Sequence, residues 1–431
     1  MLYARSVLQK YLFRNAFLKD SFWALAGSTF GRGLILAASV LIAKILGSEQ
    51  YGIYSFFKIL LINIGLFANW GLGYTATYVL SKRQNASDRQ KVIRQLYIYT
   101  SLFAWAVILL AAICYPLWRK IMTVDYSGKV LLLLIVLVFL NSIANTQNGI
   151  IAGIKQYRSQ AKLYIWNGVF TFSITLIFTF WIGLEGALYA LLISQMLFCF
   201  QNHKLIQKYL HANNANREEK ASEVNEHKLI KLSFPIAMQE MAYSVSKWLL
   251  PIIVIRYAGF SQLGVYNASE QFVALILFIP AMLKNVMLSH LSASADESAE
   301  SIAGQLKMML RVNFLATLIP AILIALLSTY IAAFYGSTYR TMPLVLSVLC
   351  ITSVFAGLTN VYAQYLISLK RNWRLFFFQI FREGTIILLL LLLLNYLPYC
   401  TASLSLALSS FCANILLLFL LKYSTQRVMD S

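Results

Sequence analysis

The sequence predicts an all-α, polytopic membrane protein whose twelve transmembrane helices form two six-helix lobes around a central cavity. Three observations support this prediction: an apolar composition, long apolar runs separated by short polar connections, and a motif that occurs twice. Of the 431 residues, 59% are hydrophobic and only 12% are charged. A single water-soluble core cannot bury so much apolar surface, so we expect the chain to lie in a lipid bilayer.

The length of each apolar run defines the predicted spans. A transmembrane helix needs about 20 mostly apolar residues. The runs therefore predict helices over residues 22–43, 51–79, 95–118, 129–152, 160–182, 185–206, 230–256, 263–290, 304–328, 340–368, 374–395 and 401–421.

Basic residues predict the orientation of these spans. Lys and Arg concentrate in the N-terminal segment and in alternate connections after it, so the positive-inside rule places both termini in the cytoplasm. The first 20 residues fit a basic amphipathic segment on that membrane face. The formal net charge of +20 therefore reflects topology, and nothing in the sequence indicates nucleic acid as a partner.

The repeated motif, G-x-x-Q-x-G-x-Y, predicts the domain organisation. It occurs at Gly47–Tyr54 and at Gly259–Tyr266, where it joins helices one and two and then helices seven and eight. The equivalent positions predict two homologous lobes, both inserted the same way up because each has an even number of helices. The predicted boundaries are an N-terminal lobe at 1–206, including the amphipathic segment at 1–20, a cytoplasmic linker at 207–228 and a C-terminal lobe at 229–431.

Two such lobes suit an alternating-access transporter, and the alternative is a duplicated scaffold that carries no cargo. Six basic residues fall inside the predicted spans, namely Arg32, Lys58, Lys247, Lys284, Arg311 and Arg382. A charge at the centre of a bilayer costs about 2.5–3.5 kcal/mol. Each should therefore face water, a counter-charge or an anion.

Acidic residues at similar depth are fewer, so the predicted cavity is positively charged. Arg32, Lys58 and Lys247 are the candidate cavity cations that bind an anionic substrate. A local ion pair, or snorkelling to the interface, is the alternative for each. That alternative is favoured for the three that lie nearer helix ends, Lys284, Arg311 and Arg382.

Helix four carries a stripe of amides. Asn141, Asn145 and Asn148 stand at positions i, i+4 and i+7, hence on one helix face. Amides in this arrangement suit hydrogen bonds to sugar hydroxyls. They suit hydrogen bonds between packed membrane helices equally well, and the sequence leaves both interpretations open.

Two intramembrane carboxylates, Glu240 and Glu270, are the candidates for coupling transport to a proton or a sodium ion. The alternative is a permanent ion pair with Lys247 or Lys58. The five cysteines are scattered, and no cluster of Cys and His suggests a metal. No motif indicates a cofactor or a catalytic set, so we do not expect an enzyme.

Residues Phe22–Arg83 resemble the opening of the Wzx-type polysaccharide flippases, which belong to the multidrug/oligosaccharidyl-lipid/polysaccharide exporter superfamily. The similarity includes Leu46-Gly47 followed by Tyr51-Gly52, and Gly71-Leu72-Gly73 followed by Lys82 and Arg83. Further similarity lies at Tyr335–Leu349 and Leu366–Trp373.

The resemblance implies translocation of an undecaprenyl-pyrophosphate-linked oligosaccharide across the bacterial inner membrane, as in O-antigen and lipopolysaccharide biosynthesis. It implies a cationic cavity for the pyrophosphate and sugars. The implied partners are the lipid-linked oligosaccharide, membrane lipids and other membrane proteins of polysaccharide assembly.

Two other functions remain open at this point. An ion-coupled drug antiporter of the same superfamily would favour an acidic cavity, whereas the basic residues outnumber the acidic ones here. A polytopic glycan polymerase or ligase usually has a large soluble domain or a long outer loop, whereas the longest predicted outer loop is short and carries a single carboxylate, Asp125.

Overall fold

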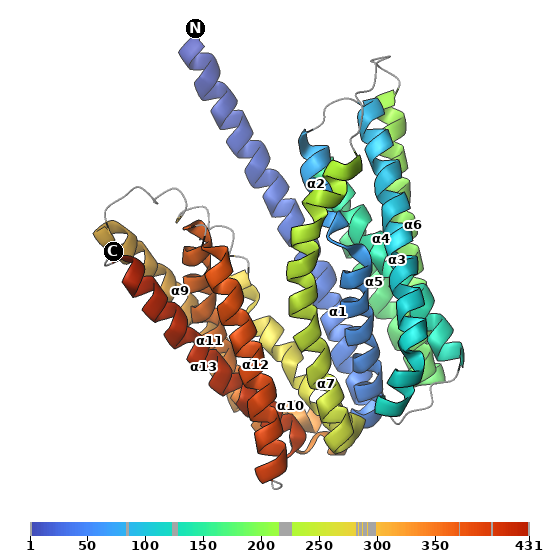
Figure 1. The fold of residues 1–431 in the computed structure, drawn as a ribbon, viewed down its shortest axis with the longest axis vertical. Coiled ribbons are helices and arrows are strands. Elements are labelled where there is room, and N and C mark those ends of the chain that lie inside the picture. The colour runs from blue at the N-terminus through green and yellow to red at the C-terminus, as the bar shows by residue number, and fades with distance from the viewer. Residues whose placement is uncertain are drawn as a thin grey trace. The chain divides into compact units, whose positions relative to one another are not determined.

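The computed structural model describes the backbone of residues 2–82, 86–122, 128–214, 226–281, 283, 287, 291, 299–369, 371–397 and 400–429 (Figure 1). These residues form helices and no strand, which confirms the all-α prediction. Within the described ranges, ten helical segments are long and apolar enough to cross a membrane.

Two of the long helices each cover two predicted spans. Helix α1 (Leu2–Asn69) changes direction at Gly47 and α7 (Glu226–Ile276) does so at Gly259. Both glycines have left-handed φ angles, 72° and 77°, with ψ angles of 173° and 179°. Only glycine adopts such a conformation without strain. The two copies of the motif therefore make the same turn. The described helices are consistent with the twelve predicted spans, except that the predicted span 51–79 is interrupted at Trp70 and Gly71.

The other helices are α2 (Leu72–Lys82), α3 (Ala86–Met122), α4 (Gly128–Gly153), α5 (Tyr157–Ile182), α6 (Leu184–Asn214), α9 (Ala299–Leu326), α10 (Ser328–Tyr335), α11 (Met342–Ser368), α12 (Asn372–Tyr396) and α13 (Ala402–Met429), with a short 3₁₀ helix at Ser337–Tyr339. Helices α3, α6 and α13 extend beyond their predicted spans, and the sequence did not predict α10.

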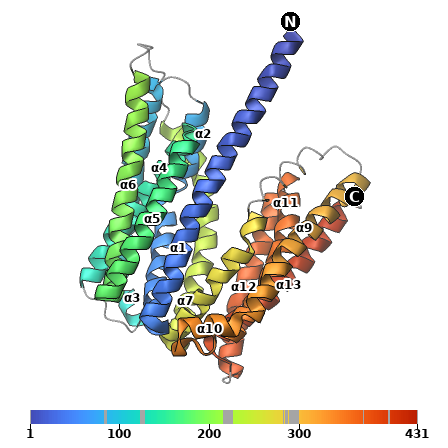
Figure 2. The same cartoon turned by 180° about the vertical axis from the view of Figure 1, so that it is seen from behind.

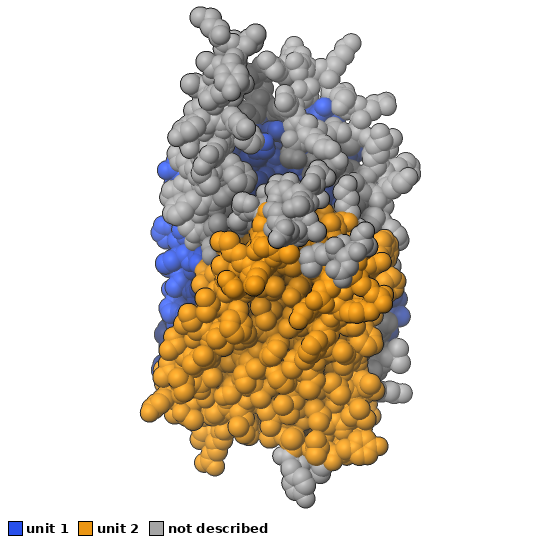
Figure 3. All heavy atoms as spheres, turned by 90° about the vertical axis from the view of Figure 1, so that its left-hand side faces the viewer, with its two compact units in different colours: residues 1–42, 57–248 blue, residues 43–56, 249–431 orange. Residues whose placement is uncertain are grey.

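The chain divides into two compact units, coloured separately in Figure 3. Unit 1 contains residues 1–42 and 57–248, and unit 2 contains residues 43–56 and 249–431. The predicted linker at 207–228 includes the end of α6 and the start of α7, and residues 215–225 lie outside the described part. Helix α1 begins at Leu2, and the side chains of the predicted amphipathic segment are also outside the described residues.

In unit 1, α2 and α4 approach until their backbones touch. A Cβ atom added at Gly149 of α4 would lie 2.0 Å from the carbonyl oxygen of Gly73. The hydroxyl of Thr77 donates to the carbonyl oxygen of Gly149 at 3.0 Å. Small residues allow this approach, which is a principal source of helix association in lipid.

Asn69 fixes the break between α1 and α2. Trp70 and Gly71 follow it with left-handed φ angles of 51° and 67°. Its side-chain oxygen accepts the backbone N–H of Gly73, and its amide donates to the hydroxyl of Thr146 in α4 at 2.9 Å. The side chain therefore caps α2 and joins it to α4.

In unit 2, the two copies of the motif cross each other. A Cβ atom at Gly52 would lie 1.9 Å from the carbonyl oxygen of Phe260, and one at Gly264 would lie 1.9 Å from the carbonyl oxygen of Ser48. Gly52, the second glycine of the first copy, contacts Phe260, which follows the first glycine of the second copy. Gly264 contacts Ser48 in the same way. The crossing therefore has local two-fold symmetry, and it gives the repetition of the motif a structural reason.

Polar contacts surround this crossing. The hydroxyls of Ser48 and Ser261 are 2.7 Å apart, and the amide of Asn267 donates to the hydroxyl of Ser55 at 2.7 Å. Tyr339 donates to the carbonyl oxygen of Ala43 at 3.0 Å. Burial raises the pKa of the Tyr339 phenol, so it remains a donor throughout the physiological pH range.

We predict that Gly149→Ala destabilises the protein by about 1–3 kcal/mol, because the added methyl group overlaps the backbone of α2. Gly384→Ala is the matched control, since no atom lies within 4 Å of a Cβ there, and alanine is the better helix former. Thermal unfolding in detergent measures both variants. Equal melting temperatures for Gly149→Ala and the wild type would contradict the backbone contact.

Candidate functional site

Two of the three predicted cavity cations have described side chains. Lys58 in α1 and Lys247 in α7 are both half-buried, and both belong to unit 1. A buried hydrogen bond of 2.8 Å from the hydroxyl of Ser244 to the side-chain oxygen of Asn63 joins their helices. The contact aligns the two helical segments, and the segments run in opposite directions (Figure 1).

This alignment sets the depth of the two lysines. Lys58 lies five residues before Asn63, and Lys247 lies three residues after Ser244. Because the segments are antiparallel, both offsets point toward the same end, by about 7.5 Å and 4.5 Å. The structure therefore places the two lysines at nearly the same depth in unit 1, and a shared depth concentrates positive charge there.

Of the other four basic residues within the predicted spans, two have described side chains and two do not. The side chains of Arg32 and Lys284 lie outside the described residues, although the backbone of Arg32 belongs to α1. Arg311 in α9 is exposed, and Arg382 forms an ion pair with the neighbouring Glu383 in α12. The pair confirms the predicted alternative of a local ion pair for Arg382.

The three asparagines of α4 all contact neighbouring groups. The side-chain oxygen of Asn141 fills the space in front of Gly65 and accepts a 2.9 Å hydrogen bond from the amide of Asn145. Asn148 accepts a 3.4 Å hydrogen bond from Asn202 in α6. These are contacts within and between helices, as the packing interpretation expects. A sugar contact by the same residues stays a prediction.

Glu270 is half-buried in the part of α7 that belongs to unit 2, one turn after Asn267. The side chain of Glu240 lies outside the described residues. A role of either carboxylate in ion coupling therefore stays a prediction, as does the alternative of permanent pairing.

The sequence interpretation missed the polar contacts that fix α4 in unit 1. Thr146 accepts one hydrogen bond from Asn69 and shares another of 2.8 Å with Thr100 of α3. Gln147 donates to Tyr97 of α3 at 3.2 Å. The signal available in the sequence was that α4, an apolar helix, carries polar residues on several of its faces. Periodicity on one face, which selected the asparagines, does not detect such contacts.

A comparison with known protein families shows which family the chain belongs to. The sequence profile of the family described as "Polysaccharide biosynthesis protein" matches residues 17–289, more than half of the chain. The chain belongs to the polysaccharide biosynthesis protein family.

The sequence of a named relative supports the assignment of the chain to this polysaccharide biosynthesis family. The EPS I polysaccharide export inner membrane protein EpsE of Ralstonia nicotianae is 20% identical over 374 residues, which cover 84% of each chain. The resemblance recognised from the sequence is therefore confirmed, and the described helices are those of a multi-pass membrane protein.

Solved structures show the fold of this family member. An inward-facing multidrug resistance MATE transporter of the MOP superfamily matches with a TM-score of 0.74 at 14% identity, covering 95% of this chain and 99% of that one. The lipid II flippase MurJ, in an inward closed conformation, matches with a TM-score of 0.73 at 16% identity, covering 94% and 87%. A MOP superfamily transporter from Pyrococcus furiosus matches with a TM-score of 0.63 at 15% identity, covering 96% of each chain.

We predict a non-additive effect when the Arg382–Glu383 ion pair is dismantled. Glu383 is only 6% exposed, so Arg382→Gln leaves a buried carboxylate without its partner and destabilises the protein by about 3–5 kcal/mol. The double variant Arg382→Gln/Glu383→Gln should recover most of this loss, because both charges are then absent. Melting temperatures in detergent test the cycle, and additive losses would mean that the two residues stabilise the fold independently.

Proposed function

We propose that the protein translocates an undecaprenyl-pyrophosphate-linked oligosaccharide from the cytoplasmic to the periplasmic leaflet of a bacterial inner membrane. The observation that carries the proposal is the shared depth of Lys58 and Lys247, two basic residues within the helices of unit 1. Family membership and the MATE-like and MurJ-like fold support it.

Two lysines at one depth in the membrane, Lys58 and Lys247, suit the binding of a negatively charged pyrophosphate. An anionic group bound at this depth would gain attraction from both ammonium groups in a low-dielectric environment. Lys binds phosphate as a point charge, whereas Arg donates a bidentate pair of hydrogen bonds. In the proposal, Arg32 is a further basic residue that binds the pyrophosphate.

The proposed mechanism is alternating access between two lobes. The cavity opens to the cytoplasm and admits the charged head group, while the polyprenyl tail stays in the lipid through a lateral gate. Closure on that side and opening on the other release the oligosaccharide into the periplasmic leaflet. Asn141, Asn145 and Asn148 are proposed sugar contacts, Glu240 and Glu270 are proposed coupling groups, and both termini are cytoplasmic.

An ion-coupled antiporter of small molecules is the second candidate, because the MATE fold is also that of multidrug transporters. Export of organic cations would favour acidic groups at the depth where Lys58 and Lys247 lie. The basic character of this region therefore favours an anionic cargo. A role as an enzyme has less support, since the family and the solved structures with this fold are transporters.

We predict that Lys58→Gln and Lys247→Gln each reduce surface polysaccharide at least about tenfold, since loss of one charge-assisted contact to phosphate removes about 1.5–3 kcal/mol of binding. Undecaprenyl-linked repeat units should accumulate on the cytoplasmic side, where added glycosidases measure them in inside-out vesicles.

Lys155→Gln is the control, because Lys155 is exposed in the connection between α4 and α5. Immunoblots of membranes must show equal amounts of all variants. Wild-type levels of surface polysaccharide in both Lys58→Gln and Lys247→Gln would exclude these lysines from the site and remove the main support for an anionic cargo.

A further inference from the structure

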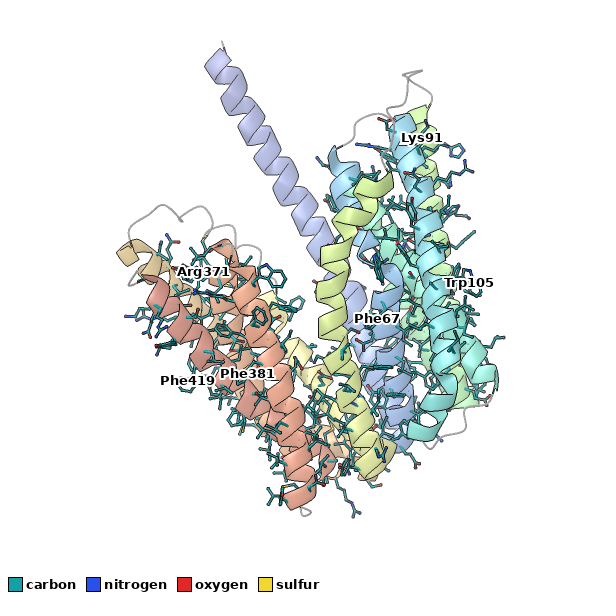
Figure 4. All side chains as sticks on the ribbon, viewed as in Figure 1. Phe67, Lys91, Trp105, Arg371, Phe381 and Phe419 are labelled. Carbon is teal, nitrogen blue, oxygen red and sulfur yellow. The ribbon has the colours of Figure 1, made fainter. Side chains whose placement is uncertain are left out.

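One face of α3 changes from basic to apolar along its length. Lys91 and Arg94 are exposed near its start. At about 100° per residue, five of the exposed apolar residues that follow lie within about 60° of Lys91 around the helix axis. These are Ile98, Leu102, Trp105, Leu109 and Ile113, with exposed fractions between 53% and 74%. Figure 4 labels Lys91 and Trp105 on this helix.

Helix α6 repeats this arrangement in the opposite chain direction. Lys204, Lys208 and His211 are exposed near its end. Exposed apolar residues precede them on the same side, namely Tyr189, Met196 and Phe200. Both helices therefore carry a basic zone at the end that the positive-inside rule assigns to the cytoplasm, and an apolar zone beyond it.

The two changes of polarity occur at the same level. The rings of Tyr97 in α3 and His203 in α6 are 6.2 Å apart, between the basic and the apolar zone of each helix. Arg89 donates a hydrogen bond to the hydroxyl of Tyr209 closer to the basic ends. Figures 1 and 2 show the two helices side by side there from opposite directions, so the contacts hold the two zones in register.

The ammonium group of Lys204 is directed toward this boundary. Its Nζ lies 4.4 Å from the centre of the Phe200 ring, which belongs to the apolar zone. The ammonium group of Lys204 therefore lies beside the apolar zone, whereas a lysine that only sought water would extend away from it.

The charge of the exposed surface is uniform in sign near the boundary. Among the described residues of these two ends, the exposed ionisable groups are Lys91, Arg94, His203, Lys204, Lys208 and His211. The single described acid there, Asp88, is buried. An anionic lipid matches both zones at once, because its phosphate meets the cations while its acyl chains cover the apolar stripes.

We propose that the paired ends of α3 and α6 form a binding site for an anionic phospholipid of the cytoplasmic leaflet. The occupant we propose is a lipid, because the cations directly adjoin apolar stripes that the acyl chains of the same molecule can cover. The bound lipid holds unit 1 at a fixed depth in the bilayer. This proposal does not depend on which cargo the protein transports.

Native mass spectrometry of the purified full-length protein tests the site. The protein is titrated in detergent with phosphatidylglycerol or with phosphatidylcholine, and the dissociation constant is measured for each. The variant Lys91→Gln/Arg94→Gln/Lys204→Gln/Lys208→Gln should bind phosphatidylglycerol at least about tenfold more weakly than the wild type, since each Lys or Arg near an anionic lipid surface contributes about fivefold. Phosphatidylcholine binding should not change.

A matched control removes the same number of exposed charges elsewhere, in the variant Lys155→Gln/Arg158→Gln/Lys162→Gln/Lys307→Gln. It should bind phosphatidylglycerol as the wild type does. Equal weakening in both variants would mean diffuse attraction without a site, and no weakening in the first would mean that these cations do not bind lipid. Displacement of phosphatidylglycerol by millimolar inorganic phosphate would indicate a site for a free anion. Each of these three results overturns the proposal.

Discussion

Close contact between helix backbones is the constraint on which the structure of each unit depends. In lipid, apolar side chains gain little from leaving their surroundings, so helices associate through tight packing and polar contacts. Gly73 and Gly149 provide such packing in unit 1, and Gly52 and Gly264 provide it in unit 2. At Gly149, Gly52 and Gly264 a side chain would overlap a carbonyl group of the neighbouring segment, and at Gly73 its Cβ atom would lie only 3.0 Å from the carbonyl oxygen of Asn145. Glycine is therefore needed at these positions because a larger residue would collide with the neighbouring helical segment, and not only because of the local backbone turn.

The repeated motif combines both uses of glycine. Its first glycine, Gly47 or Gly259, lets a long helix turn back, and its second, Gly52 or Gly264, lets the two turned segments cross. The hydroxyl and amide contacts of Ser48, Ser261, Ser55 and Asn267 then satisfy polar groups around the crossing. A motif of a few residues thus specifies a turn and its partner together.

The sequence predicted the fold class and most helix positions because apolar length and glycine placement are local signals. It also selected Lys58 and Lys247 as candidate cavity cations, and that role stays a prediction. It did not predict their shared depth, because the Ser244–Asn63 hydrogen bond joins segments about 180 residues apart. Helix α10 was also not predicted, and the break at Trp70–Gly71 was missed for a related reason. The side chain of Asn69 that caps α2 has its other partner, Thr146, in α4, and no local pattern reveals that partner.

The polar residues of α4 have a consequence for biogenesis. Its apolar stretch has a mean hydropathy of 1.5, compared with 2.1 for α3, because Asn141, Thr146 and Gln147 occupy its second half. Apart from the hydrogen bond that Asn141 accepts from Asn145 within α4, these side chains find their hydrogen bonds or close fit against α1 and α3. A nascent α4 released alone into the bilayer would expose its amides to acyl chains. The helices made before it must therefore stay beside the insertion machinery until α4 emerges, so that this part of the protein enters the membrane as a group.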